Sequence, residues 1–124
     1  MKILVVDDIG MSQIMSKRVL ENAGYKVEIA SSGTEAFKCI LQNPDLDLVL
    51  CDLMMPDFSG VELIRKLKQV KQSNDLPVFI LLTASQDAEL IKEAASVGYA
   101  DIMLKPMDPD RLIESIKSHC KDDK

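Results

Sequence analysis

The chain of 124 residues lacks the glycine motifs of nucleotide-binding enzymes and has a single histidine. Its five glycines are scattered, and neither GxGxxG nor GxxxxGK followed by Ser or Thr occurs, so no loop is built to cradle a nucleotide phosphate. This absence argues against a nucleotide-dependent kinase or a dehydrogenase. The only histidine, His119, falls near the end of the last predicted helix, where we expect a surface position rather than a phosphohistidine.

Cysteines and long apolar runs are also scarce. The three cysteines, Cys39, Cys51 and Cys120, are widely spaced without a CxxC pair, which makes structural zinc unexpected and fits a reducing compartment. No window is long enough to cross a membrane, and the apolar run after Met1 is too short for a signal peptide. We therefore expect a cytoplasmic protein without a membrane partner.

Positive charge is in deficit, since the formal net charge is −5. An acidic chain argues against direct binding of nucleic acid, whose phosphates attract positive surfaces. Apolar residues make up 47 % of the sequence and charged residues 28 %, which is ordinary for a globular protein. The length suits one domain, and no repeat or linker interrupts it, so we expect a single domain over residues 1–124.

Five short apolar segments are typical of strands. They cover residues 3–6, 26–30, 47–51, 78–82 and 101–104. Helical patterns alternate with them, which predicts an α/β fold with a five-stranded parallel sheet and helices on both faces. The second segment alternates polar and apolar residues, and the fifth is less apolar, so both favour edge positions. We therefore predict the flavodoxin-like (βα)5 fold with strand order 2-1-3-4-5.

Start signals and apolar periodicity locate the helices. Ser32 or Thr34 is a candidate cap for the second helix and Ser59 for the third, and Asp108 with Pro109 begins the fifth. The first helix is predicted over residues 10–22 and the fourth after residue 85. A polar loop over residues 72–75 and a charged tail over residues 121–124 are also expected.

Apolar residues recur at helical spacing in every predicted helix. They are Met11, Ile14, Met15, Val19 and Ala23 in the first; Ala36, Phe37, Ile40 and Leu41 in the second; Leu63, Ile64, Leu67 and Val70 in the third; Ala88, Ile91, Ala94 and Ala95 in the fourth; and Leu112, Ile113, Ile116 and Cys120 in the fifth. We expect the stripes of the second to fifth helices to face the core.

Charged or hydroxyl side chains follow four of the five predicted strands. They are Asp7 and Asp8 after the first, Asp52 after the third, Thr83 after the fourth and Lys105 after the fifth. Parallel strands end at one edge of the sheet, where open α/β sheets bind ligands, so we expect these groups to converge. In the order 2-1-3-4-5 the first and third strands are neighbours, which crowds the three carboxylates together.

Crowded carboxylates need a cation among them, and a hard divalent ion such as Mg²⁺ prefers oxygen ligands. An aspartate in such a site can act as a nucleophile on a phosphoryl group. Phosphoryl transfer mainly requires positioning and neutralisation of the phosphoryl oxygens, which Lys105 and the Thr83 hydroxyl can help to supply. The residues thus predict a magnesium-dependent phosphoryl site.

These motifs resemble the response-regulator receiver domain of two-component signalling. The matching residues are Asp7-Asp8, Asp52, Thr83-Ala84 and Lys105-Pro106, in that order at strand ends, and the resemblance covers essentially the whole chain. Each motif alone has an ordinary explanation, such as a helix cap for Asp7-Asp8. Their joint occurrence is specific, and it implies a phosphoacceptor switch whose only chemistry is self-catalysed phosphoryl transfer and autodephosphorylation.

The resemblance implies a role for each site residue. Asp52 is the phosphoacceptor, which receives its phosphoryl group from a sensor histidine kinase or a histidine phosphotransfer protein. Asp7 and Asp8 hold Mg²⁺ together with Asp52, and the backbone carbonyl of Met54 is a further expected ligand. Thr83 contacts the phosphoryl group, Lys105 pairs with it, and the Lys105-Pro106 bond is expected to be cis.

The sequence departs from the family pattern at Ile102, where members often carry an aromatic switch residue. The nearest aromatic residue is Tyr99, so either residue is a candidate for the switch role. A downstream protein is expected to bind the face formed by the fourth helix, fifth strand and fifth helix, including Tyr99 and Ile102. The sequence leaves open whether this is a stand-alone regulator or the receiver of a longer protein.

Two other functions compete with this interpretation. A magnesium-dependent phosphatase of the haloacid-dehalogenase type places a second aspartate two residues after its nucleophile, where this chain has Met54. Asp45 and Asp47 have that spacing but precede the strand. A receiver-like binding module that takes no phosphate is the other alternative, and the complete acidic set with Thr83 and Lys105 disfavours it.

Overall fold

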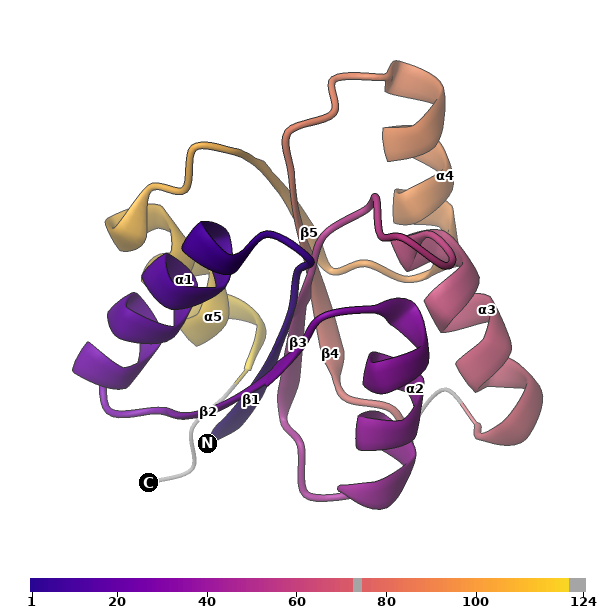
Figure 1. Ribbon diagram of the computed structural model, residues 1–124, viewed down its shortest axis with the longest axis horizontal. Coiled ribbons are helices and arrows are strands. Elements are labelled where there is room, and N and C mark those ends of the chain that lie inside the picture. The colour runs from indigo at the N-terminus through magenta and orange to yellow at the C-terminus, as the bar shows by residue number, and fades with distance from the viewer. Residues whose placement is uncertain (73–74, 121–124) are drawn as a thin grey trace.

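The computed structural model describes residues 1–72 and 75–120, so the expected tail and part of the polar loop lie outside these ranges. Within them, five strands alternate with five helices. They are β1 (Lys2–Val6), α1 (Gly10–Asn22), β2 (Lys26–Ala30), α2 (Gly33–Gln42), β3 (Leu48–Cys51), α3 (Gly60–Val70), β4 (Val78–Thr83), α4 (Ala88–Val97), β5 (Asp101–Leu104) and α5 (Pro109–His119). The strands are parallel and pair in the order β2-β1-β3-β4-β5 (Figure 1). The predicted flavodoxin-like fold is confirmed.

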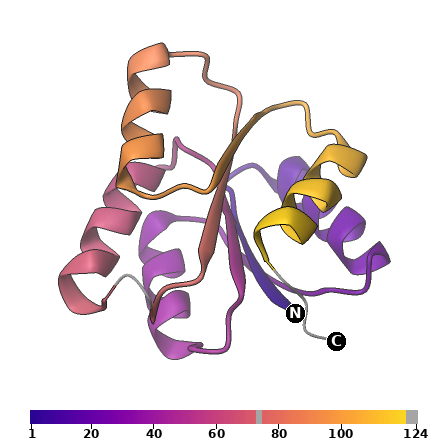
Figure 2. The same cartoon turned by 180° about the vertical axis from the view of Figure 1, so that it is seen from behind.

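Helices cover both faces of the sheet, with α1 and α5 on one face and α2, α3 and α4 on the other (Figure 1 and Figure 2). Side chains alternate along each strand, so Leu4 and Val6 pack on the α2–α4 side while Ile3 and Val5 pack with α1 and α5. This double burial explains the continuous apolar sequence of the inner strands. No helix in the described part of the chain is both long and apolar enough to span a bilayer.

Short polar residues begin the helices as their sequences predict. The hydroxyl of Ser32 accepts a hydrogen bond from the Glu35 amide at 3.1 Å, and the hydroxyl of Ser59 accepts one from the Glu62 amide at 3.2 Å. Ser32, rather than Thr34, is therefore the cap residue of α2. Asp108 caps α5 with Pro109 in the first turn, as predicted, and Asp87 caps α4.

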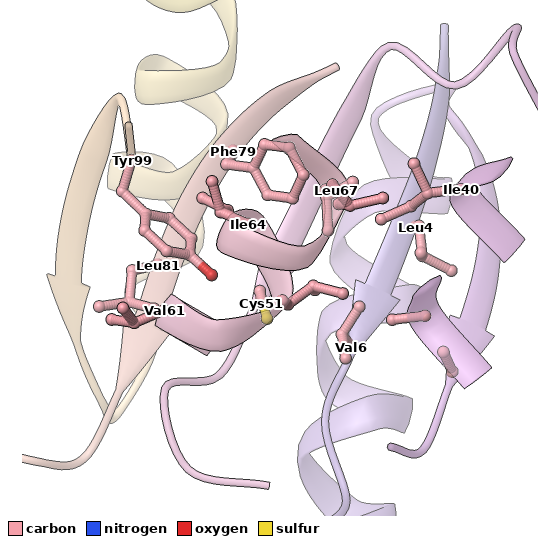
Figure 3. Packing of buried hydrophobic residues seen from close by; sticks show 14 of the residues in the cluster. Leu4, Val6, Ile40, Cys51, Val61, Ile64, Leu67, Phe79, Leu81 and Tyr99 are labelled. Carbon is pink, nitrogen blue, oxygen red and sulfur yellow. The ribbon is translucent and has the colours of Figure 1, made fainter. Parts of the chain in front are cut away.

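The core between the sheet and α2–α4 confirms most of the predicted apolar stripes (Figure 3). The predicted residues of α2 and α5 are buried or packed against the two cores. In α3 the prediction is wrong for Val70, which is exposed because it occupies the last turn of the helix. In α4 only Ala94 is fully buried, and Leu90 and Val97 pack beside it in place of the exposed Ala88 and Ala95. The larger side chains remove more apolar surface from water.

Of the apolar residues with helical periodicity in α1, only Val19 packs against the core. Met11 is 70 % exposed, and Ile14 and Met15 are also exposed. The buried face of α1 instead carries Ser16 and Leu20. Val19 and Leu20 thus pack on the sheet side of α1, and Met11, Ile14 and Met15 leave an exposed apolar patch on the first turns of the helix.

Candidate functional site

Four side chains leave neighbouring strands at the carboxyl edge of the sheet. Thr83 is the last residue of β4, and Asp7, Asp52 and Lys105 directly follow β1, β3 and β5. The strand ladder continues through their backbones: the Asp52 amide donates to the Val6 carbonyl at 2.9 Å, and the Lys105 amide donates to the Thr83 carbonyl at 2.8 Å. This pairing fixes where each side chain starts.

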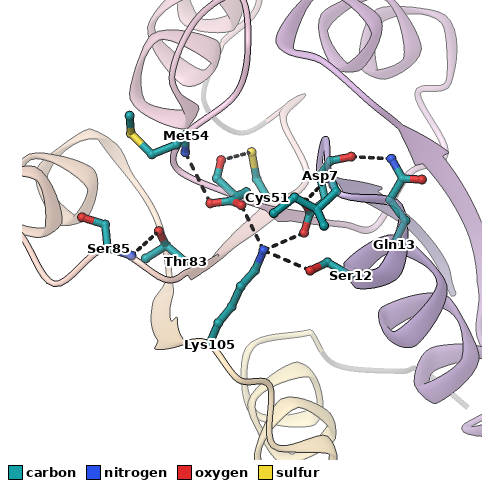
Figure 4. Close-up of polar contacts among 10 residues, drawn as sticks. Asp7, Ser12, Gln13, Cys51, Met54, Thr83, Ser85 and Lys105 are labelled. Carbon is teal, nitrogen blue, oxygen red and sulfur yellow. Dashed lines mark hydrogen bonds and ion pairs between the residues drawn. The ribbon is translucent and has the colours of Figure 1, made fainter.

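The side chain of Lys105 ties the two buried carboxylates together (Figure 4). Its Nζ lies 2.9 Å from Asp7 Oδ2 and 3.0 Å from Asp52 Oδ2, and 3.4 Å from the Ser12 hydroxyl. Asp7 is only 3 % exposed and Asp52 7 %. Two carboxylates at this depth need a cationic partner, and Lys105 provides one.

Two opposing effects act on the pKa of Lys105. Burial of the ammonium lowers the pKa, but hydrogen bonds to Asp7 and Asp52, together with their negative charge, raise it above the ordinary value of 10.5. The net direction is upward, so Lys105 carries its charge at any physiological pH. A permanent ammonium at this position suits the neutralisation of an incoming anion.

Asp8 completes an acidic cluster with Asp7 and Asp52. One carboxylate oxygen from each residue lies within 4.8 Å of the other two. Asp8 is exposed, so the cluster opens to solvent on one side. Three carboxylates with an open side fit Mg²⁺, which prefers oxygen ligands and keeps several waters. The donor set therefore agrees with the ion that the sequence predicts.

The remaining predicted residues lie around this cluster. Asp52 Oδ1 accepts a hydrogen bond from the Met54 amide at 3.3 Å, and the Met54 carbonyl as a metal ligand stays a prediction. Thr83 is 1 % exposed, and its hydroxyl oxygen accepts a hydrogen bond from the Ser85 amide at 3.1 Å, which leaves its own proton to donate. The Lys105-Pro106 bond is cis, as predicted.

Sequence reasoning missed Ser12 and Gln13 in the first turns of α1. Ser12 contacts Lys105, and the side-chain amide of Gln13 donates to the backbone carbonyl of Asp7 and lies 3.0 Å from the Ser31 hydroxyl. Both residues follow the acidic pair by only a few positions. That proximity is the one signal in the sequence that marks them, and it does not show which way their side chains point.

The expectation that Tyr99 lies on the exposed partner face is wrong. Tyr99 is 6 % exposed, its ring meets Phe79 edge to face at 5.9 Å, and its hydroxyl donates to the Gly60 carbonyl at 3.0 Å (Figure 3). A β-carbon at Gly60 would lie 2.7 Å from this hydroxyl and 2.9 Å from the Asp52 carbonyl, so only glycine fits. Burial raises the pKa of the phenol well above its ordinary value. Ile102 is half-buried against the same core.

Cys51, directly before the phosphoacceptor candidate, is fully buried as expected. Its thiol donates to the Asp52 carbonyl at 3.2 Å, and burial raises its pKa to about 12. His119 is on the surface, as expected, with Nδ1 2.9 Å from the Ser115 carbonyl. Neither residue offers a nucleophile or an acid–base group to the site.

The acidic pair that has phosphatase-like spacing lies at the opposite end of the sheet. Asp47 precedes β3 and accepts a hydrogen bond from the Lys2 amide at 2.9 Å, and Asp45 Oδ2 lies 3.5 Å from Lys2 Nζ. Because β1 and β3 are parallel, these carboxylates are at the amino edge. They do not join Asp52.

Comparison with known proteins agrees with this geometry. Residues 3–117 match the family model of the response regulator receiver domain. The chain is 32 % identical over 118 residues to a "Chemotaxis protein CheY homolog" of Campylobacter jejuni, covering 94 % of this chain and 90 % of that protein. It is also 32 % identical to a segment of the aerobic respiration control sensor protein ArcB of Escherichia coli, of which it spans 15 %.

Solved structures give the same result. A putative response regulator from Chloroflexus aurantiacus has a TM-score of 0.85 and 32 % identity, with 94 % of each chain covered. A receiver domain protein from Methanospirillum hungatei has a TM-score of 0.80 and 30 % identity, covering 94 % of this chain and 90 % of that one. Fold, site geometry and both comparisons lead to one conclusion: the chain belongs to the response regulator receiver domain family of two-component signalling.

Proposed function

We propose that Asp52 accepts the phosphoryl group in this receiver domain. The observation that carries the proposal is the placement of Lys105 Nζ between Asp52 and Asp7, with Asp8 beside them. Receiver domains are phosphoacceptor switches. Here the Asp52 carboxylate lies at the carboxyl edge of the sheet beside Lys105, whose charge can neutralise a phosphoryl anion. We also propose that residues 1–124 form one receiver domain and that it acts in the cytoplasm.

In the proposed transfer, an oxygen of Asp52 attacks the phosphorus of a phosphohistidine. The new O–P bond forms as the P–N bond breaks, and the electron pair of that bond returns to the imidazole nitrogen. Lys105 then exchanges part of its contact with Asp52 for a phosphoryl oxygen, and the proton of Thr83 Oγ1 is free to donate to another. The Met54 amide orients Asp52 for the attack.

Asp7, Asp8 and Asp52 would hold the Mg²⁺ ion, with the Met54 carbonyl as the further ligand. When bound, the ion would supply positive charge to the phosphoryl oxygens. Asp7 is also fixed by its neighbours, because its Oδ1 accepts a hydrogen bond from the Ile9 amide at 3.0 Å. The carboxylate is therefore oriented before an ion arrives.

The phosphodonor is proposed to be a protein, a sensor histidine kinase or a histidine phosphotransfer protein. Exposed apolar side chains flank the acidic cluster, with Ile9 and Met11 on one side and Met54 on the other. A groove of about 330 Å³ that Lys105 helps to line contains apolar side chains, among them Met15 and Met107, beside Ser12 and Ser16. Such a rim suits a protein surface better than a small phosphodonor.

The output surface is proposed to be the face of α4, β5 and α5, where phosphorylation would alter binding of a downstream protein. Lys92 and Leu104 are exposed there. Tyr99 lies beneath this face, between Phe79 and Gly60, and is not part of its surface.

Intact mass spectrometry after incubation with acetyl phosphate tests the proposal, with and without Mg²⁺, on the wild type and on Asp52→Asn. We expect a magnesium-dependent gain of one phosphoryl group that is absent in Asp52→Asn. Release of phosphate over many turnovers from unrelated phosphate esters would instead support the phosphatase. If the protein forms no adduct and releases no phosphate, the result would support a binding module that takes no phosphate.

A further inference from the structure

The loop between β3 and α3, residues 53–59, is tied to the start of α2 by one carboxylate, Asp57. Its Oδ1 accepts hydrogen bonds from the Gly33 and Phe58 amides, both at 2.9 Å. Its Oδ2 accepts from the Thr34 amide at 2.8 Å and from the Thr34 hydroxyl. The bonds to residues 33 and 34 join segments more than twenty positions apart in the sequence.

The neighbouring side chain adds an apolar contact at the same place. The ring of Phe58 lies against Gly33, where a β-carbon would come within 2.5 Å of a ring carbon. Lys66 Nζ of α3 sits 5.2 Å from the centre of the same ring. Glycine at position 33 therefore allows the close approach, and the loop is held on α2 by both polar and apolar contacts.

α2 has a cap of its own, so Asp57 is not required to begin the helix. Ser32 accepts from the Glu35 amide, whereas Asp57 accepts from the amides of residues 33 and 34. Ser32 and Asp57 thus bind different donors at one helix end. Because only Asp57 comes from the loop, a substitution of Ser32 weakens the start of α2 without removing a bond to the loop.

The loop reaches the phosphoacceptor through Met54. The Met54 amide donates to Asp52 Oδ1, and the side chains of Met54 and Asp57 are exposed, whereas their neighbours Leu53, Met55 and Phe58 pack against the core. The far end is fixed by the Gly60 amide, which donates to the Leu53 carbonyl at 2.8 Å. Between Met54 and Gly60, the hydrogen bonds of Asp57 connect the loop to α2.

We propose that Asp57 is a positioning residue that holds residues 53–59 against α2, and so places the backbone of Met54 beside Asp52 and the metal site. This inference rests on the proposed function, because Met54 matters through Asp52 and Mg²⁺. The carboxylate suits a permanent tie because its pKa is held well below the ordinary value of 3.8. The hydrogen bond from the Thr34 hydroxyl lowers the pKa most, and those from the backbone amides of Thr34, Gly33 and Phe58 lower it further. Desolvation opposes them with a smaller effect.

Magnesium titration followed by amide NMR shifts of Asp8 and Met54 tests the inference. The variants are Asp57→Ala, Asp57→Asn, and Ser32→Ala as a matched control that removes a cap bond from α2 without touching the loop. We expect Asp57→Ala to weaken Mg²⁺ binding about tenfold, as loss of a supporting contact does at metal sites. Asp57→Asn, which keeps an oxygen acceptor, should lie between, and Ser32→Ala should stay within about twofold of the wild type.

Hydrogen exchange of the same proteins without Mg²⁺ gives a second, independent readout. Asp57→Ala should speed exchange of the Met54 amide, and Ser32→Ala should not. Equal Mg²⁺ affinity and equal Met54 exchange in Asp57→Ala and Ser32→Ala would overturn the inference. If the wild type shows no Mg²⁺-dependent shifts, the metal part of the proposed function fails. The exchange rates then still decide whether Asp57 fixes the loop.

Discussion

The two sides of the Asp52 site differ in how their side chains are used. On one side, the start of α1 exposes Met11 and Ile14 to solvent. On the other, the loop that follows Asp52 is bonded to α2 through Asp57, and Gly60 at the start of α3 is bonded to the buried Tyr99. Both sides expose an apolar residue near the same carboxylate, Met11 on one and Met54 on the other, but the loop side also packs Met55 and Phe58 against the core. We interpret the start of α1, the free side, as a contact surface. We interpret the loop after Asp52 with Gly60 and Tyr99, the bonded side, as the part that fixes the geometry of the site.

The largest effect is expected on the bonded side. Tyr99→Ala removes a buried ring and should lower the free energy of unfolding by about 3–5 kcal/mol. Tyr99→Phe keeps the contact with Phe79, loses the hydrogen bond to Gly60, and should cost about 1 kcal/mol. Urea unfolding measures both. A loss below about 1 kcal/mol for Tyr99→Ala would place the ring outside the core.

On the free side, Met11→Ser and Ile14→Ser should change the free energy of unfolding by no more than about 0.5 kcal/mol, since both side chains are already exposed. Phosphotransfer from a histidine kinase that phosphorylates the wild type should slow about tenfold, because apolar contact with the donor is lost. Labelling by acetyl phosphate should be unchanged. Equal slowing with both donors would show that α1 acts on the chemistry and would end the distinction between the two sides.

A surface substitution on the output face separates signalling from chemistry. Lys92→Glu should leave labelling by acetyl phosphate unchanged, because Lys92 is an exposed residue of α4 and does not belong to the acidic cluster. It should weaken binding of a downstream protein about tenfold, because it reverses a charge on the proposed output face. Binding of the phosphorylated variant by calorimetry measures the loss. Unchanged binding, with a loss in Ile14→Ser instead, would move the output surface to α1.

The smallest effect concerns pH. The pKa of Asp57 is lowered in the folded protein, so its contribution to stability is present above pH 3.8 and is lost as the pH falls through the lower, folded value. The difference in unfolding free energy between the wild type and Asp57→Asn should therefore be constant from pH 8 to about pH 5 and shrink only in stronger acid. A difference that shrinks between pH 7 and pH 5 would mean that the carboxylate is not held by its donors.

The sequence predicted the fold well because its signals were local. Continuous apolar strands, caps such as Ser59 and Asp108, and two weaker edge strands together defined the order 2-1-3-4-5, and the carboxyl edge then followed from the parallel arrangement. The same logic places Asp7, Asp52, Thr83 and Lys105 on adjacent strand ends.

What the sequence did not show depends on contacts between distant segments. Apolar periodicity in α1 marks Met11 but not Leu20, and only packing against the sheet decides that Leu20 is buried and Met11 is not. The expectation that Tyr99 is on the partner face comes from the family resemblance, and the position of Tyr99 beside β5 does not show the space around Gly60 that its ring fills. No local pattern marks Asp57, because its donors lie at the distant residues 33 and 34.

The most direct measurement is the site of phosphorylation. The protein would be labelled with acetyl phosphate and Mg²⁺, digested under acidic conditions, and sequenced by tandem mass spectrometry. We predict that the phosphoryl group is on Asp52, in a peptide that also contains Cys51 and Met54. A phosphoryl group on Asp7, Asp8 or His119, with Asp52 unmodified, would contradict it.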